Sequence, residues 1–191
     1  MTQLKTFSLM TRSVRISGEV MNIFANMPHL VDVHLSQISA LDRLPESHKF
    51  PQSLRSFKLS ACAIKEDPMP VLEKLECLVV LRLDGYKGQT MSCSAQGFPR
   101  LQNSKLLGFS NTAEWKIKAG AMPKLSHLRF FRFPKMKKLP KGLLHLPSLN
   151  HVELIDTPLS SVGDDNTLKK LRQKGCEVTT YSLGPSLTLL S

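Results

Sequence analysis

The stretch that decides the fold is Lys137–Pro158, with the sequence KKLPKGLLHLPSLNHVELIDTP. Its apolar residues keep neither the helical period of about 3.6 residues nor the alternation of a strand over the whole stretch. They do contain the spacing Leu-x-x-Leu-x-Leu, at Leu149, Val152 and Leu154. We therefore interpret the stretch as a helical turn that begins at Pro140, followed by a short strand, with all of its leucines facing one interior.

The same spacing returns upstream at a nearly constant interval. Copies begin at positions 30, 54, 78, 101, 125 and 149 of the chain. The interval lies within the period of about 20 to 29 residues that is typical of leucine-rich repeats, in which each repeat adds one short strand to a parallel sheet. We therefore predict an α/β leucine-rich repeat solenoid, a horseshoe with a concave parallel β-sheet and irregular or short helical convex returns.

The repeats are expected to occupy residues 30–172. Residues 1–29 are interpreted as a lead-in with a degenerate first repeat, whose strand we place at Val14 and Ile16. One further step of the same length places Cys176 and Val178 in the pattern, so residues 173–191 are expected to hold a degenerate last strand and a C-terminal tail. Because no polar cap precedes the first copy, we expect the chain to be the tail of a longer protein.

Some positions depart from the consensus. Phe109 and Phe133 stand where the pattern accepts Cys or Asn, as Cys62 does in another copy, and we expect these rings to widen the turn or to fill space between coils. Ser104 stands where an aliphatic residue is expected, which predicts a weak joint between neighbouring coils. Trp115 is predicted to pack against the returning coil.

The chain carries an excess of positive charge. Its 26 Lys and Arg residues outnumber its 15 Asp and Glu residues, for a formal net charge of +11. Residues 116–141 hold nine Lys or Arg and no Asp or Glu. Such a balance favours acidic partners without indicating a fold.

The cysteines and the absence of targeting signals indicate a compartment. The four cysteines form no CxxC pair and no cluster with histidine at the spacing of zinc ligands, which favours reduced thiols. The chain has no Asn-x-Ser/Thr sequon, no signal-peptide core in its first residues and no apolar run of the roughly 18 to 20 residues that a membrane span needs. These features predict a cytosolic or nuclear protein.

In a solenoid, the strand positions between the buried ones face the solvent, and equivalent positions of neighbouring repeats lie about 4.8 Å apart. One such row contains four consecutive basic residues. They are Lys58, Arg82, Lys105 and Arg129, preceded by His34 and followed by Glu153 and Glu177. The row is either a solvated charged face or a docking strip for an acidic protein surface, and the sequence leaves both interpretations open.

A second row becomes apolar in three adjacent repeats. It runs through Ser36, Ser60, Asp84, Leu107, Phe131, Ile155 and Thr179. Exposed Leu107, Phe131 and Ile155 beside Arg129 and Arg132 would have the composition of a protein-binding hot spot, in which aromatic residues and arginine are enriched. The alternative is that Phe131 is partly buried or that a downstream loop covers the three side chains.

Signals for catalysis, metals or cofactors are weak. The chain contains neither of the phosphate-binding patterns GxxxxGK[ST] and GxGxxG, and neither HExxH nor GxSxG. His127 and His151 occupy one row, but two histidines without a third ligand are more often surface groups. We therefore predict a non-enzymatic module without catalytic, cofactor-binding or metal-binding residues.

Two other functions remain as alternatives. The segment FPKMKKLPK, residues 133–141, is similar to a nucleic-acid-binding or nuclear-import patch. It lies on the return of a repeat, however, and lacks alternating aromatic residues on which bases could stack. A basic nucleic-acid-binding domain, or a purely structural assembly scaffold, is the second interpretation.

Several longer phrases are more specific than the repeat consensus. They are DPMPVLEKLECLVVLRL, CSAQGFPRLQ, EWKIKAGAMPKLSHLRF and MKKLPKGLLHLPSLNHVEL. Together they resemble the C-terminal leucine-rich repeats of plant intracellular nucleotide-binding disease resistance proteins of the coiled-coil class. The resemblance spans residues 27–181, and this sequence departs from the family pattern at Phe133 and Ser104.

In that family the repeats recognise a pathogen effector or a guarded host protein, and they hold the nucleotide-binding module inactive until then. The resemblance therefore implies a cytoplasmic plant defence protein that acts in innate immunity by protein binding. The partners it implies are an effector, a host target or the receptor's own nucleotide-binding module. It implies the sensor portion only, because the phosphate loop of the nucleotide-binding module is absent from this sequence. From the outward rows, the expected contact residues are Lys58, Arg82, Lys105, Arg129, Leu107, Phe131, Arg132 and Ile155.

Overall fold

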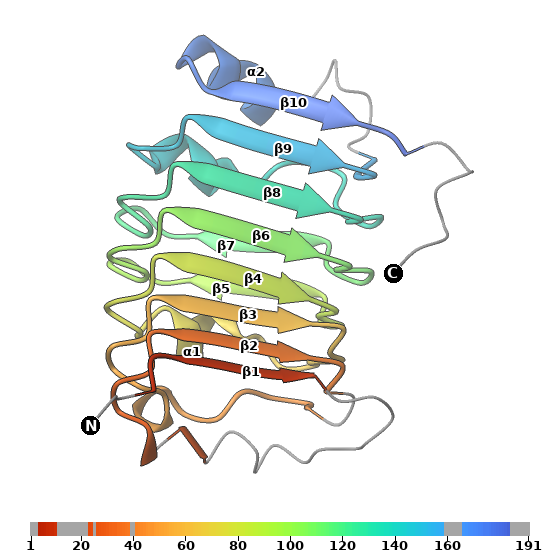
Figure 1. The fold of residues 1–191 in the computed structure, drawn as a ribbon. Coiled ribbons are helices and arrows are strands. Elements are labelled where there is room, and N and C mark those ends of the chain that lie inside the picture. The colour runs from red at the N-terminus through yellow and green to blue at the C-terminus, as the bar shows by residue number, and fades with distance from the viewer. Residues whose placement is uncertain (1–3, 11–22, 25, 39–40, 159–165, 184–191) are drawn as a thin grey trace.

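The computed structural model describes residues 4–10, 23–24, 26–38, 41–158 and 166–183. Val14 and Ile16, where we predicted a first strand, lie outside these residues. The main feature is a parallel sheet of eight strands that follow one another in chain order (Figure 1). In spatial order the strands are β1 Thr6–Met10, β2 Asp32–Ser36, β3 Ser56–Ser60, β4 Val80–Asp84, β6 Asn103–Leu107, β8 His127–Phe131, β9 His151–Ile155 and β10 Glu177–Tyr181.

The apolar residues of the repeat pattern form the face of this sheet that packs on the core. Strands β2, β3, β4, β6, β8 and β9 each bury their second and fourth residues, which are the last two apolar positions of Leu-x-x-Leu-x-Leu. Parallel pairing stacks these positions, so that Leu81 lies opposite Phe57 on one side and Ser104 on the other. The first leucine of each copy lies just before its strand and is buried too, as in Leu54 and Leu78. The predicted leucine-rich repeat fold is confirmed.

Strands end in tight turns that use the left-handed backbone region. The residue directly after each of six strands has a positive φ; these residues are Gln37, Ala61, Gly85, Gly108, Arg132 and Asp156. For residues other than glycine this conformation costs roughly 1 to 2 kcal/mol. The turns also extend the hydrogen-bond ladder, because the N–H of Arg132 donates to the carbonyl of Ile155 at 2.9 Å and the N–H of Gly85 donates to that of Leu107 at 3.0 Å. The turn residues of neighbouring coils therefore form another row.

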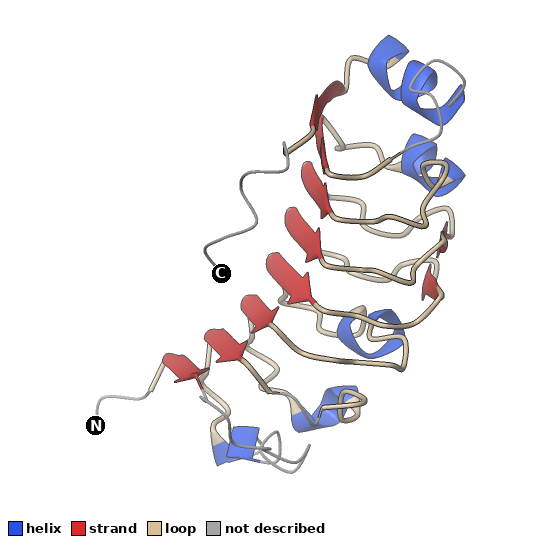
Figure 2. Cartoon of the chain, turned by 90° about the vertical axis from the view of Figure 1, so that its right-hand side faces the viewer, coloured by secondary structure: helices blue, strands red, loops and turns tan. Residues whose placement is uncertain are grey.

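The chain returns along the outer, convex side of the arc, where Figure 2 shows the helical turns. They are η2 Ser47–Lys49, α1 Met69–Leu72, η3 Lys141–His145 and α2 Asn166–Gln173. Of these, η3 lies where the sequence predicted a helical turn from Pro140. The last three elements each place leucine inside, for example Leu72 in α1, Leu143 in η3 and Leu168 in α2.

Two consecutive returns contain strands instead of helical turns. β5 Thr90–Cys93 and β7 Glu114–Ile117 pair in parallel and form a small second sheet behind the main one (Figure 1). Both alternate between exposed and buried residues, with Trp115 and Ile117 facing inward in β7. We predicted irregular or helical returns here, and an alternation of four residues is too short to distinguish from a loop by sequence alone.

The aromatic residues that depart from the consensus fill space between coils. The rings of Phe109 and Phe133 stack with centroids 4.8 Å apart. Tyr86 belongs to the preceding coil, and the centroid of its ring lies 5.4 Å from that of Phe109. Both phenylalanines are fully buried. Trp115 packs against Phe130 with ring centroids 6.0 Å apart. The rings therefore fill space between neighbouring coils that smaller side chains would leave empty.

The last strand departs from the predicted register. Thr179 lies beside Glu153, and Glu177 lies beside His151, so the final step is longer than the preceding ones. The prediction that Glu177 continues the row of Glu153, and Thr179 the row of Ile155, is wrong. A shift of two residues leaves the inward and outward faces unchanged, because side chains of a strand alternate with a period of two.

The longer final coil explains this shift. Its return contains α2, which at eight residues is the longest helix among the described parts of the chain. As a result, Val178 takes the place predicted for Cys176, and Tyr181 rather than Thr179 lies beside Ile155.

Candidate functional site

The outward rows of the concave sheet place the predicted basic residues side by side. Pairing puts Lys58 beside Arg82, Arg82 beside Lys105, and Lys105 beside Arg129. All four side chains face the solvent side and are at least partly exposed. We call these four residues the basic strip. Neighbours in such a row lie about 4.8 Å apart, close enough for their charges to repel one another.

Among the described residues, carboxylates form ion pairs with the basic strip only at its two ends. At one end, the Nζ of Lys58 lies 3.7 Å from Oδ2 of Asp32. At the other end, Arg129 donates through Nε to Oε2 of Glu153 at 2.6 Å. Among the described residues, no carboxylate forms an ion pair with either of the two middle residues of the strip. The middle of the strip is therefore its uncompensated part.

Arg82 is the most constrained member of the strip. Its Nε is buried and has no hydrogen-bond partner in the described part of the chain. Burial raises the pKa of Asp84 on the same strand, and the nearby guanidinium of Arg82 partly offsets that rise. A buried donor without a partner costs roughly 1 to 3 kcal/mol, so folding bears a cost at this position.

Beyond Arg129, the face continues into a network of charged and polar groups. His151 bridges two carboxylates, with Nε2 3.3 Å from Oε1 of Glu153 and Nδ1 3.1 Å from Oε2 of Glu177. The hydrogen bond from Arg129 is the main reason that the pKa of Glu153 is lowered. The ring of His127 lies 5.7 Å from that of His151. In the part of the chain that the structure describes, no three His, Cys, Asp or Glu side chains converge to hold a metal ion.

A shallow depression of about 190 Å³ joins this network to the basic strip. It is lined by Asn103, Ser104, Lys105, His127, Leu128, Arg129, His151 and Glu153. Small-molecule sites are usually larger, roughly 300 to 1,000 Å³. The depression is therefore smaller than a typical small-molecule site.

The predicted apolar residues are also adjacent. Leu107 lies beside Phe131, and Phe131 lies beside Ile155; all three are half-buried. We call these three residues the apolar row. The guanidinium of Arg132 lies 4.9 Å from the centre of the Phe131 ring, and its Nε lies 3.8 Å from Oδ2 of Asp156. Because none of the three side chains is fully buried, the row still offers apolar surface.

Sequence reasoning missed two residues of this face. Tyr181 extends the apolar row and is 56% exposed, and it was missed because the last step is longer than the period. Asp156 and Arg132 each follow a strand directly and have a positive φ. These equivalent positions on neighbouring coils bring the two side chains together as an ion pair. Aligning the residue after each strand would have placed these two side by side.

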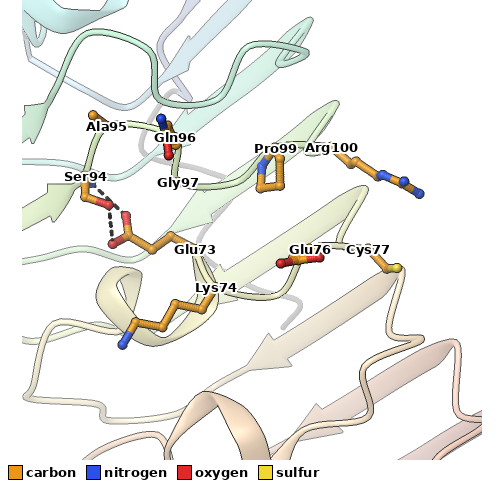
Figure 3. Close-up of a pocket in the computed structure, with 10 residues that line it drawn as sticks. All are labelled: Glu73, Lys74, Glu76, Cys77, Ser94, Ala95, Gln96, Gly97, Pro99 and Arg100. Atoms are coloured by element: carbon orange, nitrogen blue, oxygen red, sulfur yellow. Dashed lines mark hydrogen bonds between the residues drawn. The ribbon is translucent and has the colours of Figure 1, made fainter.

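A larger hollow of about 600 Å³ lies beside α1, away from the concave strips (Figure 3). Within it, Oε2 of Glu73 accepts a hydrogen bond from the Ser94 N–H and Oε1 accepts one from the Ser94 hydroxyl, each at 2.7 Å. A Cβ at Gly97 would lie 2.5 Å from this carboxylate, so the Glu73 side chain would have to move to accommodate it. Glu76, Lys74 and Arg100 also line the hollow, beside the hydrogen bonds between Glu73 and Ser94. These contacts hold two neighbouring coils together, and we assign this hollow no binding function.

Comparison with known proteins agrees with the repeats. Residues 1–172 match a family model described as a leucine-rich repeat region. Three similar proteins come from Arabidopsis thaliana. Probable disease resistance protein At1g59620 is 43% identical over 124 residues, which is 64% of this chain. Disease resistance protein RPP8 is 35% identical over 153 residues and disease resistance protein RPH8A is 32% identical over 165 residues, each match covering 78% of this chain.

These matches cover 14%, 16% and 18% of the lengths of the three relatives, so the chain corresponds to a small part of each. The family model, in contrast, spans nearly the whole chain. The chain thus belongs to the leucine-rich repeat family, and it is a leucine-rich repeat region of the plant disease resistance type.

Proposed function

We propose that the concave face is the protein-recognition surface of a plant immune receptor and that it binds an acidic protein surface. The partner is a pathogen effector, a guarded host protein or the receptor's own nucleotide-binding module. The basic strip would contact carboxylates, and the apolar row with Arg132 would bury apolar side chains beside them. Such a module works by binding and does not catalyse a reaction.

The middle of the basic strip is the observation that supports this proposal best. Arg82 and Lys105 lie on adjacent strands without a carboxylate partner among the described residues, and the Nε of Arg82 is buried without a hydrogen bond. Folding gains nothing from collecting like charges, whereas electrostatic complementarity accelerates association and suppresses wrong partners. The apolar row lies next to this charge, which is the mixture found at interface hot spots.

The proposed setting is the interior of a plant cell, in the cytosol or nucleus. The support is the similarity to disease resistance proteins such as RPP8. No helix in the described ranges is long and apolar enough to cross a membrane.

A reversal of the two uncompensated charges tests the proposal. The tagged chain would be expressed in leaf cells with a photo-crosslinking residue in place of Leu107, and crosslinked species would be identified by mass spectrometry. We expect Arg82→Glu with Lys105→Glu to abolish the crosslink while the melting temperature stays nearly unchanged. Arg129 is left intact because its reversal would face Glu153.

The matched control is Lys169→Glu with Lys170→Glu, two exposed lysines of α2. This control should retain the crosslink. An unchanged crosslink after the Arg82 and Lys105 reversal would contradict the proposal. A crosslink to nucleic acid that weakens steeply with salt would favour the nucleic-acid alternative, and no crosslink in any variant would favour a structural scaffold.

A further inference from the structure

The convex side holds a second charged surface, distinct from the concave face. A hollow of about 840 Å³ lies between β7 with its flanking residues, 113–118, and the next return, at residues 135 and 137–142. Six lysines line it; they are Lys116, Lys118, Lys135, Lys137, Lys138 and Lys141. Glu114 is the one acidic residue among the described lining residues. We call this feature the convex hollow.

Packing of the two small strands creates the convex hollow. β5 and β7 pair as a two-stranded sheet, and the following return contributes the helical turn η3 instead of a third strand. At the far end, Gly142 closes the space, since a Cβ there would lie 2.4 Å from the carbonyl oxygen of Ile117. The hollow therefore occupies the place where the second sheet stops.

The floor of the convex hollow is apolar and its rim is charged. Trp115, Ile117 and Leu139 are buried in the core beneath it. Lys116 and Lys118 point outward because the residues of β7 alternate between buried and exposed. An apolar floor with a ring of cations is the complement of an apolar side chain flanked by carboxylates.

Two of the six lysines have polar contacts, with Glu114 and Asn111, and three have no ion pair with the described residues. Lys116 lies 3.4 Å from the carboxylate of Glu114, and Lys135 donates to Oδ1 of Asn111 at 3.0 Å. For Lys118, Lys138 and Lys141, the described residues supply no ion pair, and all three side chains are exposed. Three cations on adjacent returns therefore face the solvent over one hollow.

We infer that the convex hollow binds an acidic protein segment in which an apolar side chain is flanked by aspartate or glutamate. Nucleic acid fits less well, because Trp115 is the one aromatic residue in the described lining and, as part of the floor, is only 4% exposed, so no ring face is open for base stacking. A membrane surface fits less well too, since a flat bilayer cannot reach the floor of a hollow. The volume suits a few side chains of an extended segment.

A peptide selection tests this inference on the whole chain. Random decapeptides displayed on phage would be selected against the chain, and individual peptides would then be titrated. We expect the selected peptides to combine an apolar residue with flanking Asp or Glu. Trp115 is the one tryptophan of the sequence and lines the hollow, so its fluorescence should change on binding.

Charge reversals locate the binding. Lys118→Glu with Lys138→Glu and Lys141→Glu should weaken the titrated peptides roughly tenfold or more. The matched control reverses three exposed lysines elsewhere, Lys5→Glu, Lys169→Glu and Lys170→Glu, and should leave the affinity within about twofold. Circular dichroism and melting temperature would verify that all variants fold.

The concave reversal of Arg82 and Lys105 separates this inference from the proposed function. It should leave peptide binding and the Trp115 signal intact, while it removes the Leu107 crosslink. Selected peptides without acidic enrichment, or binding that survives the reversal of Lys118, Lys138 and Lys141, would overturn the inference. Tighter lysine-dependent binding of a DNA oligonucleotide or of phosphatidylserine vesicles than of any selected peptide would overturn it as well.

Discussion

Arg129 on β8 and Glu153 on β9 are neighbours in one outward row, and the Nε of Arg129 donates a hydrogen bond to Oε2 of Glu153 at 2.6 Å. This contact ends the basic strip, because the row changes sign where the two side chains meet. It also lowers the pKa of Glu153 in the folded protein.

The first prediction concerns the pH dependence of this pair. Because the folded-state pKa of Glu153 lies below the unfolded value of about 4.3, the pair stabilises the fold above that pH, and its contribution is lost as pH falls through the folded-state pKa. Glu153→Gln should lower the free energy of unfolding at pH 7 by about 0.2 to 1 kcal/mol, the range for a solvent-accessible pair. Urea titrations at pH 7, 5, 4 and 3 should show this difference shrinking toward low pH. Glu76→Gln, which removes no ion pair among the described residues, is the control; a Glu153→Gln deficit that grows on acidification would contradict the assignment.

The second prediction concerns the turn after β4. Gly85 has a φ of +100°, and a Cβ there would lie 1.8 Å from the carbonyl oxygen of Cys62. Gly85→Ala should therefore lower the free energy of unfolding by at least about 3 kcal/mol, since a backbone clash adds to the conformational cost. Gly175→Ala is the matched control, with a φ of +84° and open space around the added Cβ. It should cost only about 1 to 2 kcal/mol, and equal losses in urea denaturation would show that the clash is relieved by movement.

The third prediction compares two aromatic neighbours. Phe133 is fully buried and stacks on Phe109, whereas Phe131 is half-buried on the concave face. Phe133→Ala should lower the free energy of unfolding by about 3 to 5 kcal/mol, and Phe131→Ala by less than about half of that. Chemical denaturation of both variants gives the comparison. A loss at Phe131 as large as that at Phe133 would mean that Phe131 belongs to the core and not to the recognition surface.

The fourth prediction concerns thiol reactivity. Burial raises the pKa of Cys62 to about 11 and that of Cys93 to about 12. The thiolate is the reactive form, so both residues should resist iodoacetamide in the folded protein at pH 8. Cys77, which is only half-buried, should be alkylated first, as followed by mass spectrometry. In urea all four cysteines should react; rapid labelling of Cys93 without denaturant would indicate that the β5 and β7 returns open locally.

Much of this face could be predicted because the fold converts sequence spacing into position. Wherever successive coils have nearly the same length, equivalent residues become neighbours, and Arg82 lies beside Lys105 for that reason. The same rule failed at the last strand, where α2 lengthens the coil and moves Glu177 beside His151. Equal spacing in the sequence gives neighbouring positions only while the returns have equal lengths. The conformation of a return, which sets its length, leaves a weaker signal in the sequence than its apolar residues do.

The amino-acid sequence by itself determined that the chain forms a leucine-rich repeat solenoid, because its apolar period leaves one consistent way to bury the leucines of the repeat pattern. It also determined which residues share the basic strip and the apolar row. Only the tertiary structure decided which of those charges are neutralised. Among the described residues, Arg129 is paired and Lys105 is not, because an ion pair depends on which carboxylate the next coil brings within reach. The convex hollow likewise depends on tertiary packing, since it forms where the β5 and β7 sheet ends against a helical turn of the following coil.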